Sequence, residues 1–213
     1  MKTEDLVTML ATGEGAVEQN AAARRYTTAI GWGAFGATLL MAVFLGVRAD
    51  LAAAALLPMF WAKMVFSCAL AAASTIAALC LARPGARLAR VKMALAAPIL
   101  AMWLLAAFTL AGAPRELWPD MFFGRTWASC PLLIAMLSFP TFVAAAWAMK
   151  GLAPTRLRLA GAAIGLLAGT VGAVVYCLHC PELAAPFVGT WYLFGMLIPT
   201  SAGALLGPWL LRW

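Results

Sequence analysis

The feature that most constrains this chain is a series of long runs without a charged residue. The runs cover residues 26–47, 93–113, 126–149, 159–181 and 183–211, and one more, 51–82, contains only Lys63. A helix needs about 20 apolar residues to cross the ~30 Å hydrocarbon core of a bilayer. Because backbone groups in lipid must be hydrogen-bonded within the segment, the runs predict six membrane-spanning helices.

The composition supports a membrane protein. Hydrophobic residues make up 65% of the 213-residue chain and charged residues 11%, whereas soluble domains carry about 25% charged residues. This balance excludes an ordinary soluble enzyme, a coiled coil and a disordered tail. We therefore expect an all-α bundle of six transmembrane helices in contact with lipid, and we interpret the net charge of +7 as a topology signal rather than a sign of nucleic-acid binding.

The positive charges predict the orientation. Six spans place both termini on one side, and that side holds eleven Lys and Arg residues against three on the other. Basic residues favour the cytoplasmic side, so both termini are expected in the cytoplasm, with the bacterial inner membrane as the location. The eleven are Lys2, Arg24, Arg25, Arg83, Arg87, Arg90, Lys92, Lys150, Arg156, Arg158 and Arg212; the three are Arg48, Arg115 and Arg125.

The first 25 residues form a separate tail before the membrane domain, residues 26–213. They lack the apolar stretch of a signal peptide. Thr3 is a suitable N-cap for a short helix that ends at Gly13 and Gly15. Its apolar stripe consists of Leu6, Met9 and Leu10. Such a helix is too short to be stable alone, so it either binds the membrane surface or another protein, or remains a frayed terminus.

Three of the five cysteines map to one end of the predicted bundle. Cys130, Cys177 and Cys180 lie at the outer ends of the fourth and fifth spans, where an oxidising compartment permits a disulfide. Cys130 begins a helix, which favours a reactive thiolate. With His179, Cys130 and Cys180 could bind a soft metal, although a structural hydrogen bond is the alternative role of His179. Cys68 and Cys80 are expected to be inert apolar side chains.

Lys63 is the one charged residue inside a predicted span. An ionisable group in lipid indicates function by default. Here the alternatives are an ion pathway and a structural charge, which snorkels to the outer surface or pairs with Asp50 or another outer acid. We favour the structural charge because no span contains an acid. Glycines at four-residue spacing in the fifth and sixth spans predict close helix packing: Gly161, Gly165, Gly169, Gly203 and Gly207.

Several short motifs resemble the NrsF family of six-span membrane anti-sigma factors. The resemblance extends from the tail to the last residue, and its most specific parts are the C-terminal block and the spacing of Cys130 and Cys180. The motifs are Arg48-x-Asp50-Leu51, Phe60-Trp61-x-Lys63, Arg83-Pro84-Gly85, Leu178-His179-Cys180-Pro181-Glu182, Ala185-Pro186-Phe187, Trp191-Tyr192 and the Leu211-Arg212-Trp213 ending.

The resemblance implies a regulator that holds an extracytoplasmic-function sigma factor through the tail. The resemblance also implies that oxidants or thiophilic metals react at Cys130 and Cys180 and thereby cause release of the sigma factor. These two residues correspond to the two key cysteines of the family. Cys177 does not match that pattern and could compete for either partner. We expect the two thiols to be reduced at rest and to face outward, and their joining to shift the fourth span against the glycine face of the fifth. No enzyme activity and no resident cofactor are expected.

Two other classes of membrane protein use thiols on the same side. A quinone-linked thiol oxidoreductase normally passes electrons between two cysteine pairs, and this chain has only three outer thiols. A soft-metal transporter needs thiols at several depths, a role that Cys68 and Cys80 would fill. Quinone reduction by the purified protein or metal uptake by cells would distinguish these alternatives.

Overall fold

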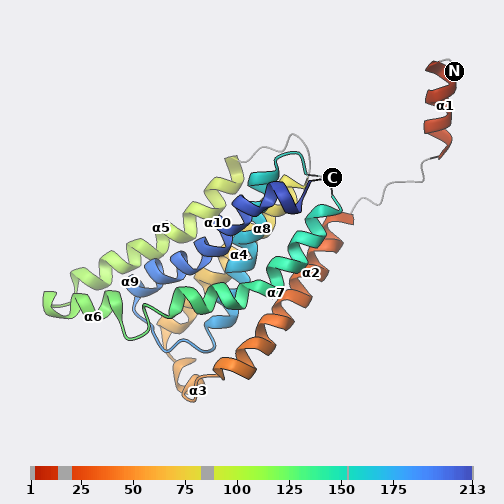
Figure 1. Cartoon of the computed structure of the whole chain (residues 1–213). Coiled ribbons are helices and arrows are strands. Elements are labelled where there is room, and N and C mark those ends of the chain that lie inside the picture. The colour runs from red at the N-terminus through yellow and green to blue at the C-terminus, as the bar shows by residue number, and fades with distance from the viewer. Residues whose placement is uncertain (1–2, 14–20, 83–88, 153, 213) are drawn as a thin grey trace.

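The computed structural model describes residues 3–13, 21–82, 89–152 and 154–212, and it confirms an all-helical fold (Figure 1). Within these residues six helices are long and apolar enough to cross a membrane. They are α2 (Ala21–Leu40, continued by the π-helical turn η1, Met41–Leu45), α4 (Pro58–Leu81), α5 (Ala89–Ala111), α7 (Cys130–Lys150), α8 (Leu157–Tyr176) and α10 (Leu193–Leu210, which continues α9, Ala185–Phe187, and the π-helical turn η3, Val188–Tyr192). The short elements outside these spans are α1 (Thr3–Gly13), α3 (Leu51–Ala54), η2 (Arg115–Leu117) and α6 (Trp118–Phe123).

Two span boundaries differ from those expected. The second span begins at Pro58, which suits the first turn of a helix because its missing N–H has no partner to lose there. The uncharged run that precedes it instead forms α3 and a turn. The fifth span ends at Tyr176, so the loop 177–184 lies outside a long helix. Both changes lengthen the connections at the same end of the bundle.

The bundle therefore has two distinct ends (Figure 1). We call one the cysteine end; it consists of the connections 46–57, 112–129 and 177–184. The opposite, tail end is where α2 begins and α10 finishes, and α1 lies apart from the bundle beyond it. The expected short N-terminal helix, with its end at Gly13, is thus present, while Gly15 falls outside the described residues.

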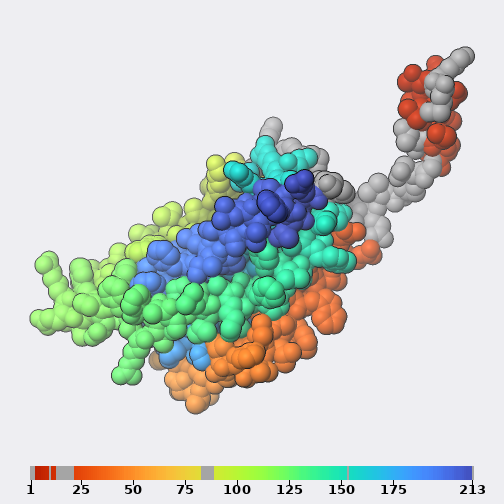
Figure 2. Space-filling model, in the orientation of Figure 1, coloured from red at the N-terminus to blue at the C-terminus, as the bar shows by residue number. Residues whose placement is uncertain are grey.

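Helix α8 forms the centre of the bundle. Most of its residues are buried, and α10, α7 and α4 pack around it. Figure 2 shows α7 and α10 next to each other on one face. Gly161 of α8 lies directly against Gly203 of α10, and a Cβ on either would overlap the other's carbonyl oxygen. This confirms close packing by glycine. The row Gly161, Gly165 and Gly169 faces α10, whereas α7 meets α8 at another glycine, Gly172, so the expected glycine face between the fourth and fifth spans is corrected.

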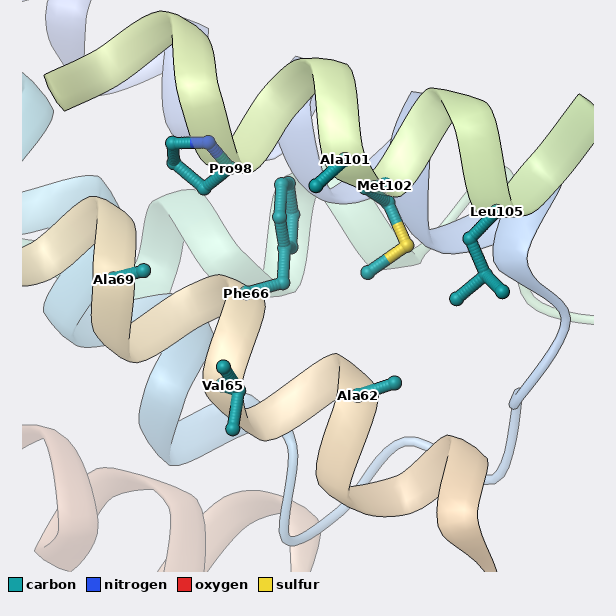
Figure 3. Close-up of a pocket in the computed structure, with 8 residues that line it drawn as sticks. All are labelled: Ala62, Val65, Phe66, Ala69, Pro98, Ala101, Met102 and Leu105. Carbon is teal, nitrogen blue, oxygen red and sulfur yellow. The ribbon is translucent and has the colours of Figure 1, made fainter. Parts of the chain in front are cut away.

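Helix α5 is at the edge of the bundle, and only three of its 23 residues are buried: Val91, Met102 and Ala106. A shallow groove of about 190 Å³ separates it from α4 (Figure 3). Phe66, Pro98 and Met102 are among the apolar side chains that line this groove. Lipid chains suit such a surface, since it offers no polar group to a soluble ligand.

Candidate functional site

The cysteine end holds three thiols in one buried cluster. Cys130 is the first residue of α7, Cys177 directly follows α8, and Cys180 lies in the loop 177–184. All three are free thiols with 0% of their surface exposed. The expectation that the thiols face outward is therefore corrected, because all three are buried in the hydrophobic core of the bundle.

Cys130 and Cys180 lie in the same buried cluster. The neighbouring Cys130 thiol is the main cause that lowers the pKa of Cys180 below its ordinary value, while burial opposes it. The positive charge of Lys63 acts in the same direction as the Cys130 thiol. Tyr176 is buried in the same cluster. The geometry thus brings together the two cysteines that the sequence paired by resemblance and favours a thiolate at Cys180.

Cys177 has a different partner. Its Sγ atom lies 3.6 Å from the Ser67 Oγ atom of α4. Burial raises the pKa of Cys177 to about 11. The Cys177 thiol therefore ionises less readily than the Cys180 thiol, and it lies beside α4.

Lys63 is buried rather than snorkelling, with 0% of its surface exposed. Its Nζ atom donates to the carbonyl oxygens of Cys180 at 2.9 Å and Glu182 at 3.1 Å. The Nζ atom also lies 5.8 Å from the centre of the Tyr192 ring, within cation–π range. The expected ion pair with Asp50 is absent, because Asp50 instead binds Arg48 at 2.7 Å.

Other elements of the cysteine end hold the same loop. The Arg48 backbone N–H donates to the Leu178 carbonyl at 3.2 Å, and its Nη1 atom donates to the Cys180 carbonyl at 3.3 Å. The Nδ1 atom of His179 lies 2.9 Å from the Gly46 carbonyl oxygen. An oxygen of the Glu182 carboxylate accepts from the Arg125 backbone N–H at 2.8 Å. The loop is thus tied to both of the other connections at this end of the bundle.

His179 is a structural side chain in this arrangement. A carbonyl oxygen only accepts, so Nδ1 carries the proton and donates to Gly46. In the described part of the chain, no three His, Cys, Asp or Glu side chains gather in a way that could hold a metal ion. The sequence prediction of a soft-metal site is therefore reduced to the two sulfurs of Cys130 and Cys180.

The remaining cysteines lie away from the cluster. Cys68 is exposed and Cys80 is half-buried, both on α4. On α1, Leu6 is 39% and Met9 60% exposed, and the other described side chains of this helix are exposed too. Leu10 belongs to the same helix, and its side chain lies outside the described residues.

Sequence reasoning missed the aromatic side of the cluster. Tyr176 and Tyr192 are fully buried beside the thiols, with ring centres 5.7 Å apart. The π-helical turn η3 carries Tyr192 into this position. Its hydroxyl makes no hydrogen bond of ordinary geometry within the described residues, yet it lies near enough to favour the thiolates of Cys177 and Cys180. The available signal was the Trp191-Tyr192 motif, to which no chemistry could be assigned.

Comparison with known proteins gives a family with this architecture. The chain matches the family described as "NrsF: Negative regulator of sigma F" over residues 10–213. It is 63% identical over 213 residues to the "Probable anti-sigma-F factor NrsF" of Azospira oryzae, covering all of both chains. It is 37% identical over 220 residues to the "Anti-sigma-F factor NrsF" of Caulobacter vibrioides, again covering all of both. No solved structure matches the chain.

Proposed function

We propose a function from the premise that the chain belongs to the NrsF family: this multi-pass membrane protein is an anti-sigma-F factor, a regulator of transcription and not an enzyme. The thiol oxidoreductase and the metal transporter are accordingly set aside. We infer that the chain resides in the bacterial inner membrane and holds sigma F, an extracytoplasmic-function sigma factor, until a signal reaches the cysteine end.

The tail, residues 1–25, is the segment that we assign to sigma F. Helix α1 lies apart from the bundle, and its Leu6 and Met9 side chains are exposed. An amphipathic helix that places such a stripe in an apolar groove is a common mode of recognition. Leu10 continues the stripe at helical spacing. We expect the stripe to bury enough apolar surface in sigma F to offset the cost of ordering the tail.

For the tail to meet sigma F, the tail end must face the cytoplasm. The distribution of basic residues supports this orientation. A reporter that works only in the cytoplasm should be active when fused after Lys92, Lys150 or Trp213, and silent after Asp50 or Asp120. A silent fusion at Trp213 would contradict the proposed orientation.

The cysteine end then acts as a thiol switch. A hydroperoxide oxidises one thiolate to a sulfenic acid and leaves as an alcohol or as water. The second thiol attacks that sulfur, the oxygen departs as water, and a disulfide joins Cys130 to Cys180. The burial of these two thiols in one cluster is the observation that carries this proposal, and the influence of Cys130 on the pKa of Cys180 supports it.

A soft metal ion is the second trigger that we consider, as a signal rather than a resident cofactor. Thiolates select soft ions, and the binding of one ion by Cys130 and Cys180 would release whatever protons the two sulfurs still carry. Two sulfurs suit an ion that accepts two ligands, whereas a structural zinc site needs four. Metal and disulfide would draw the same two segments together.

Helix α7 supplies a physical connection from the switch to the tail. It begins at Cys130 at the cysteine end, and at the tail end its Met149 Sδ atom accepts a hydrogen bond of 3.2 Å from the Tyr26 hydroxyl. Between them, Gly33 of α2 lies against Thr141 of α7. A displacement of α7 is thereby passed to the start of α2, from which the tail extends.

Serine variants test the switch. Cys130→Ser and Cys180→Ser should each keep sigma F bound during oxidant or metal challenge, because one sulfur can neither form the disulfide nor bridge an ion. Cys68→Ser and Cys80→Ser are matched controls and should release sigma F normally. Cys177→Ser should also release it, since Cys177 contacts Ser67. Normal release by both Cys130→Ser and Cys180→Ser would disprove the switch.

A further inference from the structure

Lys63 has a role that the thiol switch alone does not assign. Among the described residues it is the only charged side chain that is fully buried. A buried charge is costly unless polar partners compensate it. Nearby carboxylates are engaged elsewhere, Asp50 by Arg48 and Glu182 by the backbone of Arg125. The carbonyl dipoles of loop 177–184 therefore compensate the ammonium group, and Lys63 and the loop depend on each other.

The two carbonyls that Lys63 binds belong to Cys180 and Glu182, one on each side of Pro181. Two hydrogen bonds to one ammonium group fix the orientation of this short stretch of backbone. Arg48 donates to the same Cys180 carbonyl at 3.3 Å. The backbone of Cys180 is thus held from α4 and from the connection after α2, within the buried cluster that also contains Cys130.

The same helix holds the competing thiol one turn away. Ser67 follows Lys63 by four residues on the buried face of α4, and its own hydroxyl also donates to the Lys63 carbonyl at 3.1 Å. The Ser67 Oγ atom lies 3.6 Å from Cys177 Sγ. Helix α4 therefore holds Cys177 and Cys180 at different points: Lys63 binds the Cys180 carbonyl, and Ser67 lies beside Cys177.

We propose that Lys63 is a positioning residue that determines disulfide specificity: by clamping the Cys180 and Glu182 carbonyls, it makes Cys180 rather than Cys177 the partner of Cys130. This inference rests on the proposed thiol switch and adds the reason for its selectivity. Without the clamp, loop 177–184 loses its strongest tie to α4, and Cys177 competes for Cys130 and for Cys180.

Disulfide mapping tests this role in the full-length chain. Cys68→Ser and Cys80→Ser form the parent background, so that only the three clustered thiols react. Membranes are treated with diamide, which takes two hydrogen atoms from two thiols and becomes a hydrazine as the disulfide forms. Peptide mass spectrometry then measures each pair. The parent should form mainly the Cys130–Cys180 disulfide. In Lys63→Met, the ratio of this disulfide to the disulfides that contain Cys177 should fall by about tenfold, a factor that corresponds to about 1.4 kcal/mol.

Three further variants separate positioning from general damage. Lys63→Arg keeps a cationic donor and should give most of the parent's Cys130–Cys180 pairing. If only the volume of the side chain mattered, Lys63→Met would keep that pairing as well. Ser67→Ala removes the neighbour of Cys177 without touching the clamp, and it should keep Cys130–Cys180 dominant. Arg48 lies at the edge of the site, and Arg48→Met removes the second donor to the Cys180 carbonyl. This variant should shift the disulfide pairing severalfold in the same direction as Lys63→Met.

Thermal melting of each purified variant shows whether it has folded. A folded Lys63→Met protein with the parent's pairing would overturn the proposal; if that variant does not fold, unchanged pairing in Arg48→Met would overturn it. The assay contains no sigma F, so its result is independent of release in cells. Normal release by the serine variants would refute the thiol switch even where pairing depends on Lys63, and unchanged pairing would refute only the clamp.

Discussion

The two ends of the bundle are held by different kinds of interaction. At the cysteine end, hydrogen bonds from Lys63, Arg48 and the Arg125 backbone hold the loop that carries the buried residues Cys177 and Cys180. Toward the tail end, α8 and α10 touch backbone to backbone where Gly161 meets Gly203. Hydrogen bonds to a loop can be exchanged one at a time, whereas two helices in close-packed contact cannot shift slightly without losing the contact. The comparison suggests that the cysteine end rearranges while the packed helices move as rigid bodies.

The largest expected effect lies outside both ends, on α1. Replacing Leu6 and Leu10 together with Asp places two charges in the apolar stripe, and central interface residues are worth about 2 kcal/mol or more each. Sigma F should no longer co-purify with the membrane protein, and its regulon should be active without stress. Thr12→Ala on the same helix is the matched control, since its hydroxyl bonds only to its own helix. If the double variant still bound sigma F, the tail would not be the segment that binds it.

The next effect concerns the packed part of the bundle. Gly203→Val introduces a side chain where Gly161 leaves no space, and overpacking of this kind costs about 3 kcal/mol. We expect a clear fall in the melting temperature of the purified protein. Gly31→Ala is the control, because a Cβ there meets no atom within 4 Å. Equal melting temperatures for the two variants would mean that this contact is not rigid.

The sequence predicted the spans because charge gaps and lipid impose them, and it identified Cys130 and Cys180 through a resemblance to a family. It could not predict the surroundings of the thiols. Lys63 binds backbone carbonyls, which carry no residue signature, so an acid seemed the natural partner. Tyr176 and Tyr192 belong to long apolar runs in which a buried polar role cannot be distinguished from packing.

Helix pairing was also beyond the sequence. Glycine spacing indicates that a helix packs closely, but the neighbour is set by the whole bundle, and Gly161 faces α10 rather than α7. The same holds for Cys177, which lies three residues from Cys180 in sequence yet has its nearest polar contact, Ser67, on α4. The turn that separates them follows Tyr176, where α8 ends.

A smaller effect should mark the connection between the ends. Tyr26→Phe removes the hydroxyl that bonds to Met149 and keeps the ring, a change worth about 1 kcal/mol. If α7 moves α2 through this contact, more oxidant should be needed to release a given fraction of sigma F. Thr27→Ala is the neighbouring control, because its hydroxyl bonds only to Arg24 on its own helix. An unchanged dose response for Tyr26→Phe would exclude this contact from the connection.

The smallest effect concerns the rim of the cysteine end. The hydrogen bonds from Arg48 are the main cause that lowers the pKa of Asp50. A carboxyl with a lowered pKa in the folded state adds stability at neutral pH, and that stability is lost as the pH falls from about 4 through the lowered pKa. Asp50→Asn should therefore melt slightly earlier than the natural chain at neutral pH and equally in strong acid. Because Asp50 is exposed, high salt should also reduce the difference. A gap that widened in acid would contradict this assignment.

The most direct test follows the two thiols and sigma F in the same sample. Cells are challenged with a hydroperoxide in steps, the thiols are trapped, and the fraction of Cys130–Cys180 disulfide is measured beside the fraction of sigma F still bound. We predict that the two fractions change together across the dose range, since the disulfide is the event that weakens binding. Release of sigma F while Cys130 and Cys180 remain reduced, or complete disulfide with sigma F still bound, would contradict the account.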